Sequence, residues 1–140
     1  MRRAEETARI LAKGCRTKQV SRAYLLRECL PTRPKTLSLD VSEEMIRRGK
    51  DRADRAFRRY FRPPSGRDVC DVLVCHGNLI RYLVCRALNL DGFPWWSLGT
   101  FHCGITFIRI ATSGEVILDS YNDTGHIPIK LRTSGARQNS

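Results

Sequence analysis

The tripeptide His76-Gly77-Asn78 is the segment of this sequence best suited to chemistry. It follows an apolar run, Val69 to Cys75, and precedes a helical pattern, so it occupies a turn between a strand and a helix. In a parallel sheet ligands bind at such turns, and the free N–H groups of the helix start attract anions. His76 could meet a phosphate, Gly77 would let the backbone approach it, and Asn78 would cap the helix or donate a hydrogen bond. The spacing of these residues does not distinguish this role from a purely structural one, in which His76 only completes the turn.

Apolar spacing predicts the elements that must position this turn. The nearly continuous apolar run before His76 is typical of a strand covered on both sides, so we expect a central, parallel strand. A helix follows to about Asn89. The other predicted elements are a helix from Arg3 to Lys13, a strand from Val20 to Leu26, a helix from an Asp40/Glu43 capping box to Phe61, and a hairpin of Ile105–Ile110 and Val116–Leu118. The sum is an α/β domain with a mostly parallel sheet flanked by helices and an antiparallel hairpin at one edge.

Length and charge narrow the class of protein. A chain of 140 residues with 41% hydrophobic and 28% charged residues fits one globular domain. The net charge is +11, and 20 of the 25 basic residues are arginine, which favours an anionic partner gripped by planar guanidinium groups. A nucleic-acid surface on the arginine-rich residues 43–61 is the alternative, but we do not expect it, because no stacking aromatic residues interleave with the arginines on the exposed face of the predicted helix.

The six cysteines form no C-x-x-C pair. They are predicted to be free, buried thiols of a reducing compartment. A metal site that combines Cys75 and His76 with distant cysteines has the wrong ligand spacing, so no metal is expected. No apolar run is long enough for a transmembrane segment.

Several segments together resemble the histidine phosphatase (phosphoglycerate-mutase-like) superfamily. These segments occur in the order and at the approximate spacing that the family has. They are Met1–Thr7, Leu25–Glu28, Val74–Tyr82, Cys85–Leu88, the predicted hairpin, and Asp123–Gly125, which Pro128 follows closely. Within the superfamily the chain is most similar to a mitochondrial branch of serine/threonine protein phosphatases. The likeness covers nearly the whole chain.

The resemblance implies a role for each candidate site residue. Arg3 matches the arginine that binds the phosphoryl group, with a helix-surface arginine as the alternative. Glu28 matches the acid that protonates the leaving oxygen and helps activate water, unless it is a loop carboxylate that faces solvent. His76 matches the histidine that stabilises charge on the transferring phosphoryl group, with Gly77 and Asn78 in the adjoining turn. Such donors lower the barrier by matching the negative charge of the transition state, without a metal or other cofactor.

One family feature is missing from the sequence. The nucleophile of the family is the histidine of an Arg-His-Gly motif after the first strand, and no such motif occurs here, because Phe101 precedes His102 and Gly125 precedes His126. We therefore expect residues 1–130 to be an incomplete histidine phosphatase domain without its first strand, followed by a loose basic tail, residues 131–140. Unpaired strand edges favour self-association, so a homo-oligomer is possible.

The expected function follows from the family resemblance and from the missing Arg-His-Gly motif. The resemblance implies a metal-independent phosphatase for phosphoserine and phosphothreonine proteins, in mitochondria, and a chain that is inactive without the upstream motif. The alternative is a non-catalytic phosphate-binding or protein-interaction module, in which the same pocket holds a phosphorylated partner without cleaving it.

Overall fold

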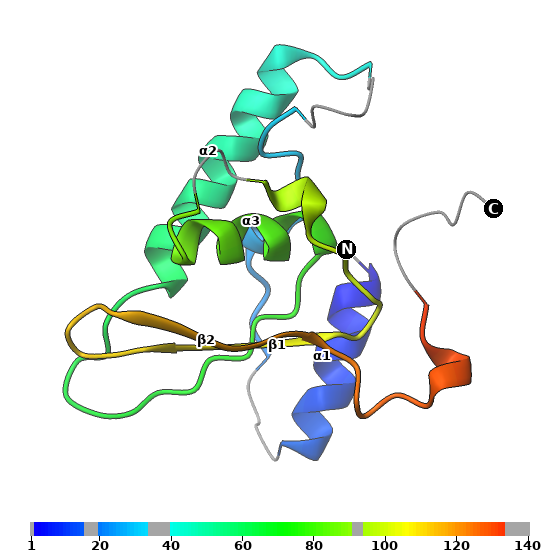
Figure 1. The fold of residues 1–140 in the computed structure, drawn as a ribbon, viewed down its shortest axis with the longest axis vertical. Coiled ribbons are helices and arrows are strands. Elements are labelled where there is room, and N and C mark those ends of the chain that lie inside the picture. Colours follow the sequence, from blue (N-terminus) through cyan, green and yellow to red (C-terminus); the bar gives the residue numbers. More distant parts are fainter. Residues whose placement is uncertain (1, 16–19, 34–39, 91–93, 134–140) are drawn as a thin grey trace.

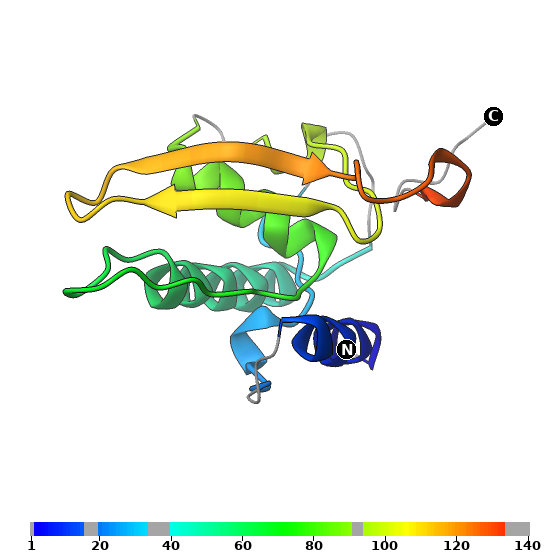
Figure 2. The same cartoon turned by 90° about the horizontal axis from the view of Figure 1, so that it is seen from below.

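The structure is a computed structural model that describes residues 2–15, 20–33, 40–90 and 94–133. Three α-helices and one β-hairpin carry the fold (Figure 1). Their bounds are α1 Arg2–Gly14, α2 Glu43–Tyr60, α3 Gly77–Ala87, β1 Ile105–Ile110 and β2 Val116–Asp123, with short 3-10 turns η1 Tyr24–Leu26, η2 Trp95–Ser97 and η3 Ile129–Leu131. Figure 2 shows the hairpin, α3 and α2 stacked as layers, with α1 on the side of α2 away from the hairpin. Met1 and most of the predicted basic tail lie outside the described residues.

The two central helices follow their predicted spans closely, but α2 is capped differently. The side chain of Ser42 accepts a 3.3 Å hydrogen bond from the backbone N–H of Met45. The predicted Asp40/Glu43 capping box is therefore wrong. Ser42 is the residue directly before the helix, and the carboxylate of Glu43 is engaged by Arg33 at 2.7 Å instead.

The core lies between α2 and α3 and is closed by the turn at Trp95. Its buried members are Cys29, Ala53, Ala56, Leu79, Tyr82, Leu83, Cys85 and Trp95. Small alanines on α2 let α3 approach closely, and the indole N–H of Trp95 donates a 2.6 Å hydrogen bond to Thr32. This core fixes the start of α3, where the His76 turn lies.

The hairpin confirms the predicted antiparallel pair. Ile110 pairs with Val116, and the side chains of β1 alternate between exposed and half-buried positions. The turn contains Gly114 at a φ of 91°, a conformation that glycine adopts without steric cost. β2 extends to Asp123, beyond the predicted end at Leu118.

Helices and a hairpin give the expected α/β class, but the described residues form no parallel ladder. Residues 69–75 run as an irregular segment, with Val69 and Val72 64% and 65% exposed. Residues 20–23 are irregular too, and the predicted strand ends in the 3-10 turn η1. Both strand predictions are wrong for this structure, because an apolar run supplies side chains but a strand also needs a neighbour for its backbone hydrogen bonds.

The cysteine prediction holds in part. All six thiols are free, but only Cys29 and Cys85 are buried, whereas Cys15, Cys70 and Cys103 are exposed and Cys75 is half-buried. The three exposed cysteines lie on segments whose apolar residues are themselves open to solvent, such as Ile10 in α1 and Val69 beside Cys70. Among the helices of the described residues, none combines the length and apolarity needed to cross a membrane.

Candidate functional site

His76 lies at the N-terminal end of α3, as its spacing predicts. It is the N-cap residue, with an extended backbone, and its carbonyl accepts a 2.9 Å hydrogen bond from the N–H of Ile80. Its side chain makes no capping hydrogen bond, so the imidazole is not used to complete the helix start. The half-buried ring therefore remains available to a ligand at the end of α3 that attracts anions.

The charges of Arg3 and Glu28 both act on the His76 imidazole. Burial lowers the pKa of His76 below its usual value, the Glu28 carboxylate opposes this shift, and the positive charge of Arg3 adds to it. These three side chains come from α1, from the segment after η1 and from the start of α3. The structure thus brings together the three residues that the sequence singled out.

Glu28 is held through its backbone. Its carbonyl oxygen accepts a 2.7 Å hydrogen bond from Arg52 of α2, and its carboxylate accepts a 3.2 Å bond from the N–H of Cys29. The side chain is exposed, as the alternative of a loop carboxylate requires, but its charge also acts on His76 and on Cys75. Burial, aided by this charge, raises the pKa of the Cys75 thiol to about 12, so the thiol is not a nucleophile at neutral pH.

Arg3 is exposed on α1, and its guanidinium has no hydrogen-bond or ion-pair partner in the part of the chain that the structure describes. Glu5, two residues after Arg3 in α1, forms a 2.8 Å ion pair with Arg22, which ties α1 to the segment before η1. This ion pair holds α1 in place, and the guanidinium N–H groups of Arg3 stay available to a ligand. An oxyanion placed beside His76 is a suitable acceptor.

Arg81 braces the turn, and sequence reasoning missed it. Its guanidinium donates to the side-chain oxygen of Asn78, to the carbonyl of Gly77 at 3.3 Å and to the carbonyl of Leu98 at 3.2 Å, and it lies 5.1 Å from the Trp95 ring. The spacing of three and four residues from Asn78 and Gly77 is the signal that could have indicated it. Asn78 is inside the helix and does not cap it, so its predicted capping role is wrong.

Gly77 has little room for a side chain. A Cβ at this position would lie 3.1 Å from the hydroxyl oxygen of Thr100, which is tight. The absence of a side chain keeps the backbone N–H groups of the turn open, as predicted for an anion site.

The other two histidines are used elsewhere. His102 Nδ1 lies 2.8 Å from the hydroxyl of Thr133, and His126 is exposed in the loop after β2. Among the described residues there is no group of three or more His, Cys, Asp or Glu that could hold a metal ion.

The assembled site can bind an oxyanion and move a proton. Arg3, His76 and the backbone N–H groups after it supply positive charge, and Glu28 is the acidic group beside them.

A family model and a solved structure are similar to this chain. Residues 31–124 match the model for the histidine phosphatase superfamily, branch 1, a span that contains His76 but begins after Arg3 and Glu28. The crystal structure of a phosphoglycerate mutase from Plasmodium falciparum matches with a TM-score of 0.65 and 31% identity, over 92% of this chain and 69% of that one.

Curated relatives match most of the chain. The serine/threonine-protein phosphatase Pgam5, mitochondrial, of Drosophila mojavensis is 36% identical over 96% of this chain, and that of Drosophila ananassae is 33% identical over the same share. The chain spans about half the length of these relatives, 49% in each case.

Proposed function

Because the chain belongs to the histidine phosphatase superfamily, we propose that it carries the phosphate-binding and acid–base part of a protein serine/threonine phosphatase. The observation that carries the proposal is the family match over residues 31–124, which includes His76 at the start of α3. The charges of Arg3 and Glu28, from two other segments, act on the same imidazole. The protein substrate, phosphorylated on serine or threonine, and a mitochondrial location are proposed from the names of the Drosophila relatives.

Each residue has a defined task in this proposal. Arg3 and protonated His76 bind the phosphoryl oxygens and stabilise the charge that spreads over them during transfer. Glu28 donates a proton to the leaving serine or threonine oxygen and then accepts a proton from the water that attacks the phosphoenzyme. Arg81 holds the Gly77-Asn78 backbone in place.

The covalent step needs a histidine that this sequence does not supply. In the family the phosphoryl group passes to the histidine of an Arg-His-Gly motif, and that triplet does not occur among the 140 residues. This observation favours a second candidate function, a non-catalytic module that holds a phosphorylated partner in the same pocket. The two candidates share the pocket and differ in turnover.

The test compares the chain alone with a version extended at its N-terminus by the first strand and Arg-His-Gly motif of a relative. We expect the chain alone to bind sulfate and a phosphoserine peptide without hydrolysing either p-nitrophenyl phosphate or the peptide. The extended chain should hydrolyse both without added metal, and His76→Ala should abolish this activity while His102→Ala leaves it intact. Sulfate binding that is unchanged in Arg3→Gln and His76→Ala would contradict both candidate functions.

A further inference from the structure

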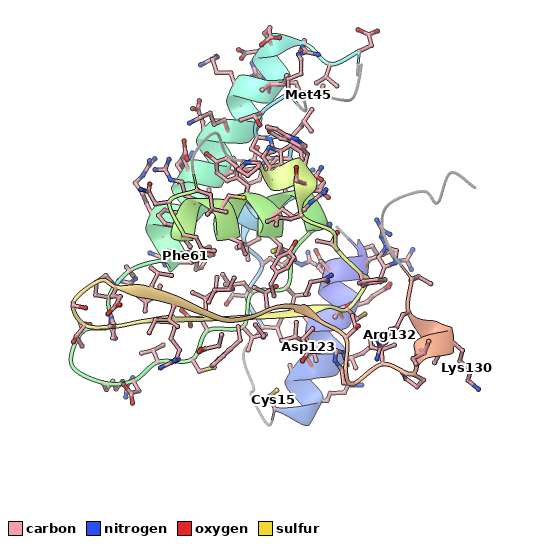
Figure 3. All side chains as sticks on the ribbon, in the orientation of Figure 1. Cys15, Met45, Phe61, Asp123, Lys130 and Arg132 are labelled. Atoms are coloured by element: carbon pink, nitrogen blue, oxygen red, sulfur yellow. The ribbon has the colours of Figure 1, made fainter. Side chains whose placement is uncertain are left out.

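A groove lies beside Glu28, between α2 and the segment from Tyr24 to Leu30, and encloses about 530 Å³. Three arginines of α2, Arg48, Arg52 and Arg55, line one wall, and Tyr24 and Glu28 line the other. Figure 3 shows charged side chains along α2 between the labelled Met45 and Phe61. The groove therefore opens from the proposed acid onto a basic helix face.

The spacing of the arginines fits an extended peptide. Residues 48, 52 and 55 follow at intervals of four and three, so they lie on the same face of α2. At about 1.5 Å of rise per residue, Arg48 and Arg55 are roughly 10 Å apart along the helix axis. That is the length of about three residues of extended chain.

The three arginines differ in whether their guanidinium groups already have hydrogen-bond or ion-pair partners. Arg52 is fixed by its 2.7 Å bond to the Glu28 carbonyl and by its position 5.5 Å from the centre of the Tyr24 ring. Arg48 is in a 2.5 Å ion pair with Glu44. Arg55 is exposed and has no hydrogen-bond or ion-pair partner within the described residues. Arg55 is thus the cation most available to a ligand.

Two carboxylates also line the groove. Asp51 lies 4.0 Å from Arg47 on the neighbouring face of α2, and Glu28 lines the opposite wall. The three arginines outnumber these two carboxylates, so the groove keeps a net positive charge that favours acidic side chains.

We propose that this groove binds acidic side chains next to the phosphorylated residue of a protein substrate. The inference rests on the proposed function, since it is the phosphate site at Arg3, Glu28 and His76 that brings the peptide to Glu28. A substrate chain that leaves that site past Glu28 meets Arg52 and then Arg55 or Arg48. Aspartate or glutamate at these points gains guanidinium contacts.

A peptide fits the groove better than a nucleic acid. The aromatic residue in the groove, Tyr24, already has Arg27 and Arg52 within 5.4 and 5.5 Å of its ring centre, so its face is used and does not serve as a stacking platform. The arginine row is also only as long as a few residues of peptide.

The test measures binding of four labelled peptides to the complete chain by fluorescence anisotropy. All four share one sequence with a central serine, which is either phosphorylated or not, and is flanked on both sides by three glutamates or three glutamines. We expect the glutamate peptides to bind about fivefold more tightly than the glutamine peptides at low salt, as about two partly exposed ion pairs would give.

Charge-matched variants assign this preference to the groove. Arg48→Gln combined with Arg55→Gln should remove the glutamate preference. Arg58→Gln combined with Arg59→Gln removes two charges from the same helix outside the groove and should preserve the preference. Thermal melts confirm that the variants are folded. An unchanged glutamate preference in the double variant would overturn the proposal, and so would a single-stranded oligonucleotide that displaces the peptides at an equal concentration.

A separate comparison, between phosphorylated and unphosphorylated peptides, tests the proposed function. Phosphorylation should strengthen binding in the double variant as in the parent chain, and Arg3→Gln should remove this effect of phosphate. If phosphate makes no difference while the glutamate preference depends on Arg48 and Arg55, the proposed function fails but an acidic-peptide groove is still supported.

Discussion

The hydroxyl of Tyr82 on α3 donates a 2.8 Å hydrogen bond to the carboxylate of Asp54 on α2. Lys50 and Arg86 lie 2.7 and 3.5 Å from the same carboxylate, so one acid joins both helices. Burial tends to raise the pKa of Asp54, but the hydrogen bonds from Lys50 and Tyr82 outweigh it and lower the pKa. Because α3 begins at the His76 turn, this contact also fixes the distance between that turn and α2.

Replacing Tyr82 with phenylalanine should destabilise the fold. The substitution keeps the buried ring and removes one hydrogen bond to a charged acceptor, so we expect a loss of about 1–2 kcal/mol in the free energy of unfolding. Chemical denaturation measures it. Tyr60→Phe is the matched control, since the Tyr60 hydroxyl has no hydrogen-bond partner among the described residues. Equal losses in both variants would show that the Asp54 contact contributes nothing specific.

Gly49→Ala should also destabilise the fold, although alanine is the better helix former by about 1 kcal/mol. A Cβ at position 49 would lie 2.6 Å from the carbonyl oxygen of Leu30, a backbone atom that can move only with the segment that carries Glu28. We expect a net loss of about 1–3 kcal/mol in denaturation experiments. Gly14→Ala is the control, because nothing lies within 4 Å of the added Cβ there, and it should be neutral or slightly stabilising.

The contrast between helices and strands shows what sequence pattern can predict in this chain. α2 and α3 were predictable because their apolar residues repeat along one face, and the hairpin because Gly114 marks its turn. Residues 69–75 were not, because their apolar run says nothing about the presence of a hydrogen-bonding neighbour. The residues of the site were inferred from the family resemblance and stay a prediction, and the structure adds that the charges of Arg3 and Glu28 act on His76.

The residues that support the site, Arg81 and Arg52, could not be predicted from the sequence. The contacts of Arg81 with Leu98 and of Arg52 with the Glu28 carbonyl join segments far apart in the chain, and no local pattern indicates such a pair. Each arginine could equally have been assigned to a solvated helix face. The fold decides which of the 20 arginines are structural and which are free for ligands.

Arg81→Lys should weaken anion binding at the turn. Lysine keeps the charge but loses the planar fork that reaches Asn78, Gly77 and Leu98 together, so the turn is held less well. We expect sulfate to bind about fivefold more weakly by calorimetry, roughly the effect of one lost charge-assisted hydrogen bond. Arg86→Lys is the control, because it disturbs Asp54 and the Phe57 ring but not the turn, and should lower stability with little effect on sulfate affinity. Parallel losses of stability and affinity in both variants would remove the positioning role of Arg81.

The pKa of His76 should respond in opposite directions to its two charged neighbours. Burial holds this pKa below the usual value of about 6.5, Glu28 raises it and Arg3 lowers it. Glu28→Gln should therefore lower the pKa further, and Arg3→Gln should raise it. Proton NMR titration can follow each of the three histidines, with His102 and His126 as internal references and His76→Ala to assign the signal.

The same titration predicts how anion binding depends on pH. Sulfate stays doubly charged across the range, and it favours the protonated imidazole, so its affinity should rise as the pH falls through the His76 pKa, which itself should increase when sulfate is bound. An affinity that is flat between pH 5 and about 7.5, or His76 shifts of the same sign in both charge variants, would contradict the proposed arrangement.

In the extended chain, Glu28→Gln should slow the hydrolysis of poor leaving groups most. A serine alkoxide needs a proton as it leaves, whereas p-nitrophenolate leaves with little protonation, so the loss should be about 10² to 10⁴ for a phosphoserine peptide and smaller for p-nitrophenyl phosphate. Initial rates with both substrates, under conditions where formation of the phosphoenzyme limits the rate, give the comparison. His76→Ala serves as the reference, because loss of charge stabilisation should slow both substrates alike. Equal losses on the two substrates in Glu28→Gln would remove Glu28 from the role of acid, while a selective loss would assign the leaving-group proton to the carboxyl group that the fold places beside His76.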